Sequence, residues 1–298
     1  MYTFSGESEL MKLKHLIDQP DKMPTISKVG QKLIASFNDD EVSVSQIAEQ
    51  LALDPALSAR VLRLANSPYF KVPRSIETIE AALQTLGLVM VRNLVIGSTV
   101  AAAFKATQGL DLKQFWRYNL YTACASRWLA SQAEVDADRV FTLGVMHAIG
   151  QLHMHVVMPT ELVALNKQIS VFDTRRAQLE LDAFGFHYGD VSAELAQAWH
   201  FPLSLVDALR HVAQPLAAPN FSEAAAWVHL GAWRASVEVL ALSDKAQLDC
   251  YPRAVARRLH LDLGPNWTPA LAEADHRDAR GVMPPLGKLS GGLEALFE

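Results

Sequence analysis

The chain has 298 residues, of which 50% are hydrophobic and 20% are charged, and its formal net charge is −5 at pH 7. This apolar fraction is sufficient to bury a core and excludes a disordered chain. The acidic balance argues against a general nucleic-acid-coating protein. The two cysteines, Cys124 and Cys250, exclude a disulfide scaffold and a cysteine-rich zinc module.

Targeting and membrane signals are weak. The first residues, MYTFSGESEL, lack the basic segment and the apolar run of a signal peptide. The longest apolar stretch, Leu94–Phe104, is about half of the ~20 residues that a membrane span needs. We therefore expect a cytoplasmic protein with no membrane insertion.

The first part of the chain shows the apolar spacing of short helices. A lead-in helix is expected within residues 1–19. Four further helices are predicted over 23–37, 43–51, 55–66 and 75–86. Asp54 and Pro55 favour the start of the third, as an N-cap followed by a proline whose missing N–H costs nothing there. Gly87 is suited to the position that follows the last turn of the fourth.

Longer helical patterns follow. Asp111 is expected to cap a helix that extends to Leu129. Residues 139–158 are apolar almost all round, which predicts one central, buried helix. Further helices are predicted from 159 onward and over 173–184, 189–199, 203–211, 223–239, 252–261 and 269–280. Neither a βαβ rhythm nor a regular hairpin spacing occurs, so the predicted fold class is all-α.

The end of the chain differs in composition from the rest. Glycines and prolines from Gly281 onward predict a flexible tail over 281–298. The alternative is that Leu293, Leu296 and Phe297 at its tip dock on a partner.

One block of sequence is more specific than a helical pattern. In DPALSARVLRLANS, residues 54–67, amphipathicity requires neither the Asp-Pro nor the Asn-Ser pair. Together with weaker matches that include GVMHAIG at 144–150, this block resembles the HDOD domain, the catalytically degenerate branch of the HD phosphohydrolase superfamily. The signature positions are Asp54, Pro55, Asn66, Ser67, Gly87 and Gly150.

The resemblance covers residues 20–215 and implies a multi-helix HD-like bundle with a role in bacterial signal transduction. Residues 216–280 would then form a C-terminal helical extension. We expect this extension to pack on the bundle, because Trp227, Leu230 and Trp233 need a surface to cover.

The resemblance also allows a check of the superfamily's metal site. HD hydrolases bind metal ions through a histidine on one helix, an adjacent His-Asp pair on another, further histidines and a late aspartate. The first histidine falls at Tyr118 or Asn119, neither of which is a usual ligand. The His-Asp pair falls at His147-Ala148, so that the histidine is present and the carboxylate is missing.

The later ligand positions are also incomplete. A histidine is present at His187, but a His-His pair would fall near residues 212–213, where only the adjacent His211 is available. The late aspartate falls near Ala232. Since a catalytic site of this type needs at least three protein ligands and a water position, we expect no metal, no other cofactor and no catalytic residues. The vestigial metal positions are His147, His187 and, with a shifted register, His211.

Plainer interpretations compete with each pattern. Buried histidines bonded to backbone groups explain the same positions, and the pair His153 and His155 carries little weight as a further site. Residues 45–64 resemble a helix-turn-helix with Arg60 and Arg63 facing DNA, but acidic neighbours favour two packed helices, so nucleic acid is not the expected partner. Three arginines form a basic helix face that is either solvated or a phosphate site: Arg253, Arg257 and Arg258.

The sequence therefore favours a non-catalytic signalling module that binds protein partners, with their identity and the oligomeric state left open. One alternative is a metal-dependent phosphohydrolase that binds Fe, Mn or Zn through the three histidines and a carboxylate such as Asp182 or Asp190. Another is nucleotide sensing without hydrolysis, although no phosphate-cradling loop occurs.

Overall fold

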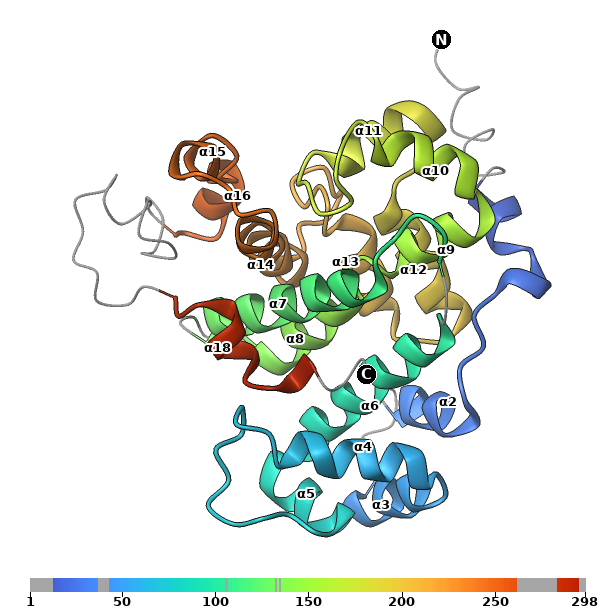
Figure 1. Ribbon diagram of the computed structural model, residues 1–298, viewed down its shortest axis with the longest axis vertical. Helices are drawn as coiled ribbons and strands as arrows, with labels where there is room; N and C mark the ends of the chain where they lie inside the picture. The colour runs from blue at the N-terminus through green and yellow to red at the C-terminus, as the bar shows by residue number, and fades with distance from the viewer. Residues whose placement is uncertain are drawn as a thin grey trace.

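A computed structural model describes residues 13–36, 43–104, 107–131, 133, 135–261 and 283–294. Within these ranges every regular element is a helix and no strand occurs (Figure 1). The predicted all-α class is therefore confirmed. The helices form two lobes, a smaller N-terminal lobe and a larger main lobe, which are joined through α6.

The N-terminal lobe contains the first helices of the bundle, blue to cyan in Figure 1. They are α2 (Lys28–Ala35), α3 (Val44–Ala52), α4 (Pro55–Ala65), α5 (Ile79–Leu86) and α6 (Leu88–Ala103). The lobe has its own core, made by Leu33, Ile47, Leu51, Leu57, Val61, Leu83, Val91 and Val95. Because α3 and α4 both face this core, the stretch that resembled a helix-turn-helix is a packed helix pair. Arg60 donates a hydrogen bond to Ser98 of α6.

The main lobe surrounds the long helix α7. Its helices are α7 (Leu112–Ala130), α8 (Ala137–Met146), α9 (Ile149–Val157), α10 (Pro159–Asn166), α11 (Arg176–Phe184), α12 (Tyr188–Ala198), α13 (Leu203–His211), α14 (Glu223–Val239), α15 (Asp244–Asp249) and α16 (Arg253–Arg258). Helix α14 packs along α7 and α8, and Trp227 and Trp233 join the same core as Phe115. The expected packing of the C-terminal extension on the bundle is confirmed.

The helix starts predicted from capping residues are confirmed in detail. The Asp54 carboxylate accepts a hydrogen bond from Leu57 N at 3.0 Å, and Pro55 is the first residue of α4. The Asp111 carboxylate accepts from Gln114 N at 3.0 Å at the start of α7. Gly87 separates α5 from α6 with φ +81°, a backbone conformation that favours glycine.

The Asn66 side chain explains the Asn of the Asn-Ser pair. Its amide donates to the carbonyl oxygens of Leu62 and Ile76, both at 2.8 Å, and its Oδ1 accepts from Ile76 N at 2.8 Å. One side chain thus satisfies the last turn of α4 and ties the following loop back to it.

Several predicted boundaries need correction. Residues 139–158 form two helices, α8 and α9, which are separated by a turn at His147-Ala148, and α9 packs against α12. Helix α2 begins only after its cap Ser27, and α5 only after its cap Thr78. Helices α6 and α15 were not among the predicted elements. Of the lead-in helix, residues 13–17 are helical; residues 1–12 and the predicted helix 269–280 lie outside the described residues.

The prediction of a flexible tail is also wrong for residues 283–294, the part of the tail that the structure describes. Residues 283–294 pack on the main lobe through the short helix α18 (Leu286–Ser290), red in Figure 1. Leu286 and Leu293 are fully buried, because apolar side chains among the glycines and prolines supply an anchor. Leu293 thus contacts its own chain. Leu296 and Phe297 lie outside the described residues.

One helical stretch of the described chain, Ala137–Val157, is long and apolar enough to cross a membrane. Of its apolar window, 89% is buried inside the fold. Helices α5 and α6 together also pass this test, but they are bent by 115°. Burial of this kind is typical of core helices.

Removing the Asn66 side chain should destabilise the fold. In Asn66→Ala, Ile76 N and two carbonyl oxygens lose a partner, so we expect the free energy of unfolding to fall by about 1–3 kcal/mol in urea titrations. Asn220→Ala, at an exposed position, is the matched control and should change it by less than about 0.5 kcal/mol. Equal effects of the two substitutions would contradict the structural role of Asn66.

Candidate functional site

The vestigial His147 lies at the turn between α8 and α9. Its Nδ1 lies 2.8 Å from the Gly144 carbonyl oxygen, so Nδ1 carries the proton and donates it. The side chain is fully buried, and Nε2 has no hydrogen-bond partner among the described residues. The Tyr118 ring lies 5.3 Å away. Burial lowers the pKa of His147 from 6.5 to about 4, so the imidazole is neutral at pH 7.

The next residue, Ala148, stands where a ligating aspartate would be, and the helix that follows is closed against α12. Gly150 N donates to the Ser192 hydroxyl at 2.8 Å, and that hydroxyl lies 3.1 Å from the His147 carbonyl oxygen. A Cβ atom at Gly150 would lie only 2.1 Å from the Tyr188 carbonyl oxygen. Only glycine fits there, which gives the signature Gly150 a packing role.

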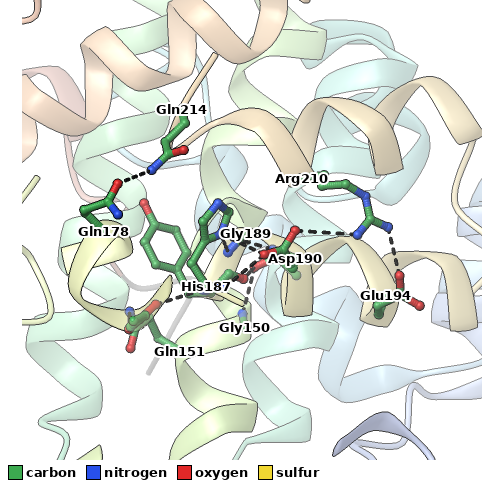
Figure 2. Close-up of polar contacts among 12 residues, drawn as sticks. Gly150, Gln151, Gln178, His187, Gly189, Asp190, Glu194, Arg210 and Gln214 are labelled. Carbon is green, nitrogen blue, oxygen red and sulfur yellow. Dashed lines mark hydrogen bonds and ion pairs between the residues drawn. The ribbon is translucent and has the colours of Figure 1, made fainter. Parts of the chain in front are cut away.

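His187 caps the start of α12. Its Nδ1 accepts from Gly189 N at 3.0 Å and from Asp190 N at 3.4 Å. The Asp190 carboxylate accepts in turn from His187 N at 3.0 Å, so that His187 and Asp190 form a reciprocal capping box (Figure 2). Arg210 of α13 then lies between Asp190, at 3.6 Å, and Glu194, at 2.8 Å. The Asp190 carboxylate is therefore engaged with a helix start and an arginine.

The remaining predicted positions are spread over several helices. Asn119 donates to the Phe115 carbonyl oxygen at 2.9 Å within its own helix, and His211 Nδ1 lies 2.9 Å from the Asp207 carbonyl oxygen. His229, beside the predicted Ala232 position, contacts the Val212 carbonyl oxygen at 2.8 Å.

The two further histidines and the second carboxylate are also engaged. His153 Nε2 lies 3.1 Å from the Leu16 carbonyl oxygen, and His155 Nδ1 lies 2.6 Å from that of Gln151. Asp182 accepts from Gln178 at 2.8 Å.

These side chains do not form a metal-binding set. Within the described residues, no three His, Cys, Asp or Glu side chains are grouped so that they could hold a metal ion. The unprotonated Nε2 of His147 has no hydrogen-bond partner among the described residues and could ligate a metal. One imidazole alone, however, does not supply the ligands that a catalytic cation requires. The donor set therefore does not fit the metal site of HD hydrolases.

Sequence reasoning missed a buried charged cluster beside this region. Glu180 and Arg176 form an ion pair at 2.7 Å, with both side chains fully buried. Glu180 also accepts from Gln151 at 2.6 Å and from Tyr188 N at 2.8 Å. The pair thus connects α9, α11 and the first turn of α12. In the sequence it looks like an exposed i,i+4 pair, so only the tertiary structure reveals it.

The basic face on α16 is partly used within the chain. The Arg258 guanidinium lies 4.2 Å from the centre of the Phe221 ring, and that of Arg253 lies 5.6 Å from the centre of the Tyr251 ring. These cation–π contacts favour a structural role over a phosphate site.

Most of the chain matches a known domain family. The HDOD domain family matches residues 23–215. An uncharacterized protein of Treponema pallidum (strain Nichols) is 23% identical over 198 residues, which are 65% of this chain and 38% of that protein. The chain thus matches well under half the length of that relative.

Three solved structures share the architecture. An HDOD domain protein of unknown function from Geobacter sulfurreducens has a TM-score of 0.73 at 22% identity, covering 98% of this chain and 99% of that one. A candidate phosphohydrolase from Shewanella amazonensis SB2B has a TM-score of 0.68 at 24% identity, covering 99% and 97%. A candidate signal transduction protein from Marinobacter aquaeolei VT8 has a TM-score of 0.66 at 18% identity, covering 97% and 64%. At these identities the likeness shows the fold.

The buried His147 should make stability depend on pH. Above pH 6.5 the imidazole is neutral in both states; as the pH falls towards 4, the unfolded chain binds a proton that the folded chain excludes. A folded-state pKa of about 4 corresponds to a loss of about 3 kcal/mol across this window. In urea titrations from pH 7.5 to 4, His147→Asn should lose less stability than the wild type. The exposed-site control His200→Asn should keep the wild-type slope, and an unchanged slope in His147→Asn would contradict this burial.

If His187 acts as a helix cap, a residue that caps helices but cannot replace the imidazole as a metal ligand should preserve the stability of the fold. Asn is among the best N-cap residues, so His187→Asn should stay within about 0.5 kcal/mol of the wild type, whereas His187→Ala should cost about 1 kcal/mol. Thermal and urea unfolding of both variants check this. Equal losses in Asn and Ala would show that the ring itself is required.

Proposed function

Because the chain belongs to the HDOD domain family, we propose that it is a regulatory module of bacterial signal transduction. It acts in the cytoplasm by binding other proteins, and its former hydrolase site performs no catalysis. The observation that carries the proposal is the use of the two remaining histidines. His147 donates its proton to the turn that it closes, and His187 accepts the amide hydrogens of a helix start.

The packing around these histidines supports the same function. A hydrolase of this superfamily needs an open position for a metal-bound water beside its ligands. Here the signature glycine brings α9 against the Tyr188 carbonyl, and the Ser192 hydroxyl bridges the two helices. The residues that resemble a hydrolase site therefore hold the main lobe together.

The second candidate function is a metal-dependent phosphohydrolase with a non-standard ligand set. It draws on the free Nε2 of His147 and on Asp190, whose carboxylate lies 3.4 Å from His187 Nδ1. Asp190 is already paired with Arg210, however, and the Asp182 carboxylate accepts from Gln178. This candidate therefore requires both carboxylates to leave their present partners.

Two assays separate the functions. With Fe²⁺, Mn²⁺ or Zn²⁺ present, hydrolysis of an activated phosphodiester by the wild type should equal that of His147→Asn and of the metal-only blank, because the described residues offer no ligand set for the cation. Turnover that the wild type shows and His147→Asn lacks would establish the hydrolase instead. Chemical cross-linking in cells of the source species should capture a defined protein partner, whose binding to the purified chain saturates.

A further inference from the structure

The C-terminal segment, residues 283–294, lies beyond the residues matched by the family and returns to the junction between the two lobes (Figure 1). Little of the segment is regular secondary structure, since α18 spans only five residues. Three of its apolar side chains are nevertheless deeply buried, Met283 at 2% exposure and both Leu286 and Leu293 at 0%. The segment is thus bound in the manner of a docked peptide.

Leu293 is packed in a cluster that spans both lobes. It belongs to a separate apolar cluster whose other members come from α4, α6, α7 and α8. We call the surface that they form the interlobe groove; it is lined by Leu64, Met90, Leu94, Leu120, Cys124 and Phe141. Its full burial makes Leu293 the main apolar anchor of the segment's end.

Backbone contacts hold the segment at two further points. At its start, the Glu238 carboxylate of α14 accepts from Leu286 N at 3.1 Å. Near its end, Tyr69 N donates to the Gly291 carbonyl oxygen at 3.0 Å. Tyr69 directly follows the signature Asn-Ser-Pro turn, so the segment contacts both the family's most specific block and the C-terminal extension.

The shape of the groove also selects the sequence of its occupant. Gly291 has φ +53°, and a Cβ atom there would lie 2.7 Å from the Tyr69 Cα. Beside it, the Ser67 hydroxyl is buried and has no hydrogen-bond partner among the described residues. An occupant therefore needs a leucine that starts a helical turn, a glycine five residues later, and a second leucine seven residues after the first.

We propose that the interlobe groove is the peptide-binding site of this module, and that the C-terminal segment occupies it as an intramolecular ligand. The intermolecular ligand of the groove is a segment of a partner protein that has the same leucine–glycine–leucine spacing. A tethered segment has an effective concentration on the order of mM, so the partner must compete with it, and binding is gated by its release. This inference rests on the proposed function and names the surface through which that function operates.

The test uses a fluorescein-labelled peptide with the sequence of residues 283–298 and full-length protein. In Leu293→Asp, a buried carboxylate should release the tethered segment, so fluorescence anisotropy should show peptide binding about a hundredfold tighter than to the wild type. Lys288→Asp is the matched control, because it places the same residue at an exposed position of the same segment, and it should behave like the wild type. A peptide that carries the Leu293→Asp change should not bind.

A folded Leu293→Asp protein that fails to bind the peptide would overturn the proposal. If that variant does not fold, a protease site inserted within 262–282 of the wild-type chain replaces it. After cleavage, the segment should exchange with labelled peptide, and a segment that never exchanges would overturn the proposal equally. A captured partner that binds the wild type and Leu293→Asp alike would refute the groove but leave the proposed function standing. Turnover of phosphodiesters would refute that function alone.

Discussion

The close approach of Gly150 to the Tyr188 carbonyl is the contact on which the centre of the main lobe depends. It lets α9 lie directly on α12, just after the turn at His147-Ala148, where the apolar pattern alone would continue one helix. The turn buries the His147 ring and directs its Nδ1–H to Gly144. The same packing sets the start of α12, where His187 serves as the cap. A hydrolase-like pair of histidines thus becomes part of the scaffold.

Much of the fold follows from local chemistry. Asp54 and Asp111 cap the helices that the sequence predicts for them, and the tryptophans of the extension cover the surface of α7 and α8 as expected. Features that depend on distant partners were not predictable. No local pattern shows that Arg176 and Glu180 are fully buried, or that an apolar run must break at His147, because both follow from where α12 packs. The sequence indicated backbone hydrogen bonds for buried histidines at these positions, but their partners, Gly144 for His147 and the start of α12 for His187, required the structure.

The C-terminal segment shows the same limit of local reasoning. Its glycines and prolines are typical of a loose terminus, yet Leu286 and Leu293 are buried and two backbone hydrogen bonds hold the ends. Gly291 is required here because its backbone lies close to that of Tyr69. Under the proposed function, this buried segment occupies the surface through which the module recognises its partners.

The metal content of the protein tests the central claim most directly. The chain should be purified without chelator under low oxygen, so that ferrous iron is retained, and its iron, manganese and zinc measured per chain. With the histidines committed to scaffold roles, less than about a tenth of an equivalent of any one metal is expected, since hydrolysis of this type depends on the ion. Near-stoichiometric metal that is lost in His147→Asn or His187→Asn would contradict the account and restore the hydrolase.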